Sequence, residues 1–151
     1  MRVAALHWGV KQSFRAYVEG AGGAISTDAG AERTERGEIA FPAGNGGLTV
    51  DADGRLQGVG TFTGEVRFEA HGGMLSVRLT YLSVDAQGAS LKVADERGKP
   101  VEIASLDLAA ATLDEGDLVI PARLSMDGSY LLGDHYPPRT VIDPVRLKLA
   151  G

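Results

Sequence analysis

The first element that the hydrophobic pattern predicts is a helix over residues 8–19. Val10, Phe14 and Val18 lie four residues apart along this stretch, which is the spacing of residues that share one face of a helix. A glycine-rich stretch begins at Gly20, and glycine commonly ends a helix. We therefore expect a short N-terminal helix with one apolar stripe.

Most of the remaining chain alternates between apolar and polar residues, as β-strands with one buried face do. The clearest alternation runs from Thr61 to Val84 and is interrupted by the sequence Ala-His-Gly-Gly-Met at 70–74. Glycines between two alternating runs are typical of a hairpin connection, which places His71 on or beside a turn. On one face of this hairpin we expect Phe62, Val66, Phe68, Leu75, Val77, Leu79 and Tyr81.

Shorter strands are predicted on both sides of the hairpin. They cover residues 24–26, 38–41, 89–93, 101–111, 118–126 and 145–149, with a change of parity near Ser105. The residues Asp51 to Gly54 form a polar turn rather than a calcium loop, because the remaining ligand positions of such a loop do not match. Many short strands with turns between them predict a mainly β fold. We expect an antiparallel β-sandwich or barrel-like domain with one short N-terminal α-helix.

The composition supports one folded domain over residues 1–151. The 21 glycines against 6 prolines fit turns between strands rather than disorder. The absence of cysteine excludes disulfides, thiolate metal sites and cysteine nucleophiles. A net charge of -5 gives no support to nucleic-acid binding, and the chain has no run of 18 apolar residues that would cross a membrane.

Candidate chemistry is sparse when the residues are taken one at a time. The histidines, His7, His71 and His135, do not have the close spacing of metal ligands on one element. Ser13 and Tyr17 lie four residues apart, so on the predicted helix they share a face. Alone, Tyr17 is more simply an amphipathic residue at the edge of the core, and His71 a turn residue.

Four segments together resemble the HtaA family of bacterial haem-uptake proteins. They are WGVKQSFRAYV at 8–18, FTGEVRF at 62–68, HGGML at 71–75 and YPPRTVIDP at 136–144. Their order and separations fit one domain of that family. The resemblance therefore spans nearly the whole chain.

The resemblance implies a ferric haem b carrier in haem and iron acquisition, and not an enzyme. It implies that Tyr17 is the axial iron ligand, as a tyrosinate, and that His71 donates a hydrogen bond to it. It also implies that Ser13 and Tyr136 hold the haem propionates. The expected haem-binding set is completed by Phe14, Met74 and His135.

Two of these residues depart from the usual pattern of the family. His135 stands where an aromatic residue is common, and we expect a solvated loop residue in preference to a second polar or iron-binding group. Met74 follows the two glycines, and we expect its thioether to pack on the porphyrin.

The resemblance also bears on partners and location. It implies haem itself and other haem-uptake proteins as partners, and it leaves a homodimer open. Family members are secreted or held at the cell surface, whereas residues 1–8 lack the apolar stretch of a signal peptide. The expectation is therefore either an export signal that was removed or a cytoplasmic protein. The alternative function is a small intracellular enzyme, or a binding protein for another hydrophobic ligand, in which Tyr17 and His71 form an acid–base pair.

Overall fold

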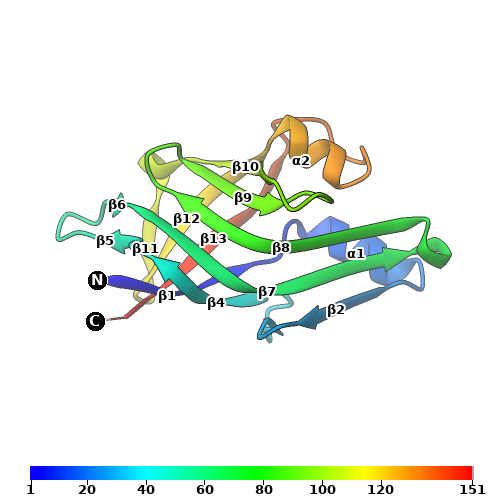
Figure 1. The fold of residues 1–151 in the computed structure, drawn as a ribbon, viewed down its shortest axis with the longest axis horizontal. Helices are drawn as coiled ribbons and strands as arrows, with labels where there is room; N and C mark the ends of the chain where they lie inside the picture. Colours follow the sequence, from blue (N-terminus) through cyan, green and yellow to red (C-terminus); the bar gives the residue numbers. More distant parts are fainter. Residues whose placement is uncertain (151) are drawn as a thin grey trace.

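A closed antiparallel β-barrel forms the body of the protein in the computed structural model, which describes residues 1–150 (Figure 1). Its eight strands follow one another around the barrel as β1 (Arg2–Trp8), β4 (Ile39–Gly46), β7 (Val59–Ala70), β8 (Leu75–Asp85), β9 (Ser90–Ala94), β10 (Pro100–Leu106), β12 (Asp117–Leu124) and β13 (Val141–Ala150). Pairing of β1 with both β13 and β4 closes the ring. The prediction of a mainly β fold is confirmed, and of the two expected forms the domain is a barrel and not a sandwich.

Short strands and helices lie outside the eight barrel strands. The additional strands are β2 (Ala24–Asp28), β3 (Glu32–Arg33), β5 (Thr49–Val50), β6 (Leu56–Gln57) and β11 (Thr112–Asp114). The helices are α1 (Gln12–Gly20) and α2 (Met126–Leu131), together with single 3-10 turns at His71–Gly73 and Leu108–Ala110. Within residues 1–150, no helix has the length and apolar character of a membrane-spanning segment.

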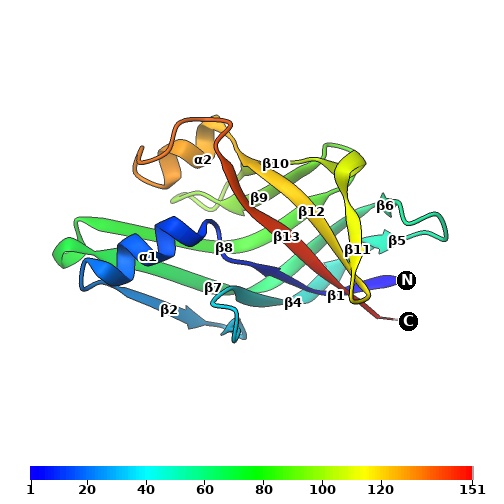
Figure 2. The same ribbon diagram turned by 180° about the vertical axis from the view of Figure 1, so that it is seen from behind.

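The hairpin of β7 and β8 extends past the barrel wall. β8 pairs with β7 along its length, but it pairs with β9 only over residues 83–85. On the other edge of the hairpin, residues 24–28 of β2 pair with residues 65–69 of β7. The three strands therefore form a projecting sheet, and α1 lies against it (Figures 1 and 2).

The projecting sheet and α1 share an apolar core. The cross-strand pairs that face α1 are Val66 with Leu79, Phe68 with Val77 and Ala70 with Leu75, and all six side chains are buried. Phe14 and Val18 of α1 are also buried, and the rings of Phe14 and Phe68 lie 5.2 Å apart. This confirms the buried Phe14 and Val18 of the helix and five of the seven residues expected on one face of the hairpin, and a sixth, Phe62, is buried on the barrel side of the bulge.

Tyr81 is the exception. The register of β7 and β8 shifts between residues 62 and 65, where Gly64 has a φ of 110° and Tyr81 a φ of 52°. A β-carbon at Gly64 would lie 2.6 Å from that of Ala31, so only glycine fits there. The bulge turns Tyr81 outward, with 75% of its surface exposed, and buries Leu82 instead. The prediction that Tyr81 faces the core is wrong for this reason.

The predicted start of the first helix is also wrong. Residues 2–8 form β1, because their backbone pairs with β13 on one side and with β4 on the other. The chain turns at Val10, whose φ is 65°, and α1 begins only at Gln12. Tertiary pairing thus overrides the helical spacing of the first residues.

Other boundaries also differ from the predictions. The strand expected to reach Met126 ends at Leu124, since Ser125 accepts a hydrogen bond from the amide of Gly128 at 2.8 Å and begins the unpredicted helix α2. The strand expected over 101–111 ends at Leu106. Its register shift lies between residues 102 and 104, close to the change of parity expected near Ser105.

Candidate functional site

Tyr17 and His71 meet at the free end of the β7–β8 hairpin. The Tyr17 Oη lies 2.6 Å from the Nε2 of His71, although the two residues are 54 positions apart in the chain. A phenol donates to an unprotonated imidazole nitrogen, whereas a protonated nitrogen donates to the phenol oxygen. The pair can therefore share one proton in either direction.

The helix presents Tyr17 because its opposite side is buried. Phe14 and Val18 are fully buried, which leaves Ser13 and Tyr17 on the outer side of α1. Tyr17 keeps 41% of its surface exposed. Tyr17 is thus partly open to a ligand, with its phenol oxygen held by His71.

The turn presents His71 through its backbone conformation. His71, Gly72 and Gly73 have φ values of 56°, 67° and 93°. A β-carbon at either glycine would meet nothing within 4 Å, so the glycines serve the left-handed conformation and not close packing. The prediction that this segment connects the two strands is confirmed.

A second hydroxyl pair lies on the same helix. The Oγ of Ser13 is 2.8 Å from the Oη of Tyr136, in the connection between α2 and β13. The main-chain carbonyl of Tyr136 accepts a hydrogen bond from Ser129, and its ring meets Phe14 edge-on at 6.4 Å. Ser13, Phe14 and Tyr136 are thus brought together one helical turn from Tyr17.

His135 lies beside Tyr17 in the structure. The two rings are tilted, with centroids 5.3 Å apart, and the rings of Tyr17 and His71 are 5.7 Å apart. Tyr17 therefore has an imidazole neighbour from each of two loops. His135 is an exposed loop residue, as expected, but it also covers part of the Tyr17 ring.

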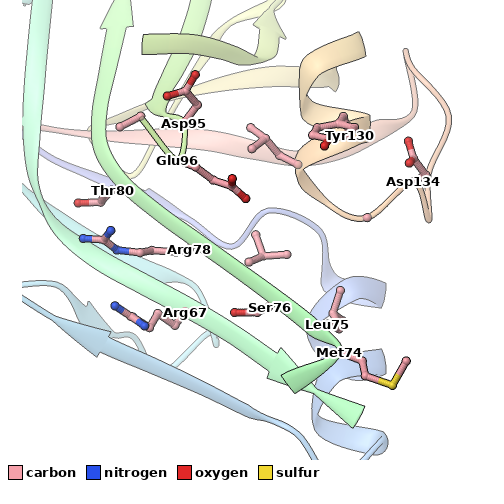
Figure 3. A pocket seen from close by; sticks show the side chains of 14 residues that line it. Arg67, Met74, Leu75, Ser76, Arg78, Thr80, Asp95, Glu96, Tyr130 and Asp134 are labelled. Carbon is pink, nitrogen blue, oxygen red and sulfur yellow. The ribbon is translucent and has the colours of Figure 1, made fainter. Parts of the chain in front are cut away.

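Met74 faces a neighbouring groove. Its side chain is 91% exposed and lines a cavity of about 560 Å³ between β8 and the end of α2 (Figure 3). Tyr130 and Asp134 line the groove on the α2 side, and Arg78 lines it on the β8 side. Tyr17 and His71 do not line this cavity. Of the expected site residues, only Met74 does.

The outer face of the hairpin is charged. Glu65 accepts hydrogen bonds from the guanidinium groups of Arg67 at 2.9 Å and Arg78 at 2.5 Å. These hydrogen bonds, that of Arg67 first, hold the pKa of the Glu65 carboxyl below its usual value. This ionic cluster lies on the face of the sheet away from α1, so it does not contact Tyr17.

The third histidine, His7, lies away from the site. His7 lies on β1, where burial first, and then Lys148, lower the pKa of its imidazole. Among residues 1–150, no three side chains of histidine, aspartate, glutamate or cysteine gather as a metal cluster. If iron binds at this site, the phenol of Tyr17 is the oxygen donor that the geometry offers.

Arg15 and Asp143 were not predicted as functional residues. Arg15 lies in the first turn of α1 and Asp143 on β13, and their side chains form an ion pair at 2.5 Å. The signal for Arg15 was a charge beside the apolar stripe of a predicted helix. Asp143 was part of a segment quoted for the resemblance, but it was given no role.

Comparisons with known proteins agree on one relationship. The model of the HtaA family, described as Htaa, matches residues 3–148. No curated protein sequence matches the chain.

Several solved structures have the same fold. The N-terminal domain of HtaA from Corynebacterium glutamicum is 24% identical with a TM-score of 0.73, covering 99% of this chain and 100% of that one. The C-terminal domain of the same protein is 25% identical with a TM-score of 0.70, covering 97% and 94%. The heme binding protein HtaB from that organism is 19% identical with a TM-score of 0.71, covering 96% and 91%. Because the family model matches residues 3–148, nearly the whole chain, this chain belongs to the HtaA family.

Proposed function

We propose that this protein binds ferric haem b and carries it in haem and iron acquisition, with Tyr17 as the axial ligand. The observation that supports this most directly is the 2.6 Å hydrogen bond between the Tyr17 Oη and the Nε2 of His71. A phenol oxygen with an imidazole partner is a suitable donor for iron(III). Membership of the HtaA family and likeness to a heme binding protein favour the same ligand.

The Tyr17–His71 pair provides a base that can remove the proton from the tyrosine ligand. A free phenol has a pKa of about 10, so it is protonated at neutral pH. When bound, ferric haem supplies a hard Lewis acid that favours an anionic oxygen. The Nε2 of His71 takes up the phenol proton and then donates a hydrogen bond to the Tyr17 oxygen. That hydrogen bond stabilises the phenolate.

Neighbouring side chains fit the rest of a haem. The hydroxyls of Ser13 and Tyr136, paired at 2.8 Å without ligand, are donors for the propionate carboxylates. Phe14 meets the ring of Tyr136 edge-on. Met74 is exposed at the adjoining groove, so its side chain would turn from there to pack its thioether on the porphyrin. His135 moves off the Tyr17 ring to admit the ligand, since its own ring lies there now.

Titration with hemin tests the proposal. We expect the wild-type protein to show a saturable Soret change and a charge-transfer band typical of tyrosinate ligation. Tyr17→Phe keeps the ring but loses the oxygen, so it should lose the band. Tyr81→Phe is the matched control, because Tyr81 is an exposed tyrosine at the bulge, outside the site.

The proposal has one decisive negative outcome. A folded wild-type protein that shows no saturable Soret change does not carry haem, and the Tyr17–His71 pair would then be left for acid–base chemistry on another ligand. Sedimentation with and without hemin tests whether the loaded protein forms a homodimer.

A further inference from the structure

Asp143 of β13 holds the segment that leads into α1 at four points. Its carbonyl accepts a hydrogen bond from the Trp8 indole at 2.9 Å, and its amide donates to the carbonyl of Val10 at 2.9 Å. Its carboxylate accepts the amide of Gln12 on Oδ1 at 3.1 Å and the Nη1 of Arg15 on Oδ2 at 2.5 Å. Asp143, which lies on a strand distant in sequence, thus forms hydrogen bonds with four residues between the end of β1 and the first turn of α1.

The N-terminus of α1 has no capping side chain from its own segment. Lys11 occupies the N-cap position without a side-chain hydrogen bond, and the first turn carries no acidic residue. The first amides of a helix need acceptors, and a negative charge near them is favourable. Asp143 supplies both from 131 positions away in the sequence.

Arg15 makes the link rigid. It is a buried residue with 8% of its surface exposed, and its Nη1 also donates to the carbonyl of Gly9 at 2.7 Å. A buried guanidinium without its carboxylate would be an unpaired charge. The ion pair therefore ties the turn before the helix, the first helical turn and β13 into one unit.

The same segment contains one strained backbone position, Val10. Val10 is β-branched and buried, yet its φ of 65° lies in the left-handed region. Such a conformation persists where the surroundings impose it, and here the amide of Asp143 holds the Val10 carbonyl. The direction in which α1 leaves β1 is set by this contact.

We propose that Asp143, acting with Arg15, is a positioning residue for the haem ligand. This inference rests on the proposed function. Ser13 and Tyr17 lie on the helix that Asp143 anchors, and their oxygens meet Tyr136 and His71 at 2.8 and 2.6 Å. A shift of α1 by about 1 Å is enough to break either contact, because hydrogen bonds weaken steeply with distance and angle.

The test uses the full chain with Asp143→Asn. The asparagine still offers an oxygen to the amide of Gln12, but it no longer balances the charge of Arg15. We expect hemin to dissociate about tenfold faster or more, as is usual when an outer partner of a metal ligand is lost, and the charge-transfer band to shift. In the ligand-free protein, the ¹⁵N resonance of the His71 Nε2 should also shift, because its contact with Tyr17 loosens.

Asp117→Asn is the matched control. Asp117 is likewise an aspartate paired with an arginine, Arg146 at 3.0 Å, and is more deeply buried than Asp143, but it lies on β12 and does not contact α1. We expect it to leave hemin dissociation and the His71 resonance unchanged, although it removes an ion pair of the same kind.

Gly9→Ala provides an independent route to the same effect. A β-carbon at Gly9 would lie 2.1 Å from the Nη1 of Arg15, so the guanidinium must move away from Asp143. The same β-carbon would lie 3.1 Å from the Oδ2 of Asp143, so the carboxylate keeps its charge while the ion pair is pushed apart. This variant decides the question if Asp143→Asn does not fold.

The outcomes separate this inference from the proposed function. Folded Asp143→Asn and Gly9→Ala proteins with wild-type hemin dissociation and an unchanged His71 resonance would overturn the positioning role. A wild-type protein that fails to bind hemin would overturn the proposed function instead, and the His71 resonance of the ligand-free variants would still test whether Asp143 orients Tyr17.

Discussion

At the scale of single residues, the site depends on a tyrosine with two imidazole neighbours of different kinds. His71 contacts the oxygen of Tyr17 through Nε2 at 2.6 Å, whereas His135 lies against its ring at 5.3 Å. The first contact can exchange a proton and the second cannot. We therefore propose that His71 supports the Tyr17 oxygen when a ligand binds, and that His135 covers the Tyr17 ring when no ligand is bound.

Removal of His71 should weaken haem binding without abolishing it. In His71→Ala the Tyr17 oxygen remains, but the group that takes its proton and supports the phenolate is lost, so we expect hemin affinity to fall by about 10–100-fold. Competition with a haem-scavenging globin measures the change. His7→Ala is the control, since His7 lies on β1 outside the site. Equal losses in both variants would contradict the assigned role.

At the scale of elements, the site is built from the helix α1 and the projecting hairpin of β7 and β8. The hairpin leaves the barrel at the bulge where Gly64 has a φ of 110° and faces Ala31. The bulge changes the register, and the residues beyond it, Val66 and Phe68, face α1 in consequence. The position of His71 at the hairpin tip thus depends on a glycine seven residues before it.

Gly64→Ala should destabilise the protein more than an equivalent change elsewhere. We expect a cost above the roughly 1–2 kcal/mol of a left-handed L-residue, because the added β-carbon also overlaps Ala31. Gly98→Ala is the matched control, with a φ of 80° and no atom within 4 Å of its β-carbon. Urea unfolding of both variants gives the comparison. The same loss in each would mean that the contact with Ala31 carries no penalty.

At the scale of the whole molecule, ion pairs hold the outer face of the barrel together. Asp117 is buried, which alone would raise the pKa of its carboxyl. The hydrogen bonds from Lys148 at 2.8 Å and Arg146 at 3.0 Å outweigh this, so the pKa lies below its usual value. A carboxyl with a lowered pKa stabilises the fold where it is ionised.

The sign of this effect predicts loss of stability in acid. Asp117 contributes its full share above the unfolded pKa of about 3.9, and the share is lost as the pH falls through the lower folded value. We expect the wild-type free energy of unfolding to drop below about pH 4. The drop should be smaller in Asp117→Asn, which has no carboxyl to protonate. Parallel pH profiles for the two proteins would show that Asp117 is not responsible.

The local sequence pattern was sufficient to predict part of the candidate site. The helical spacing of Phe14 and Val18 placed Tyr17 on an outer face beside Ser13, and two glycines placed His71 in a turn. These features depend on residues within one or two turns of each other, where periodicity is informative. The start of α1 at Gln12 was missed because the preceding residues pair with two strands from elsewhere in the chain.

Patterns along the chain were enough to predict the mainly β class, the central hairpin and the side of the helix that carries Tyr17. They could not predict the closure of the barrel, the outward turn of Tyr81, the contact of His135 with Tyr17 or the capping of α1 by Asp143. Each of these joins segments whose meeting depends on strand register and on which strands pair. Alternation along one strand shows which residues are buried, but it carries no information about the partner that buries them.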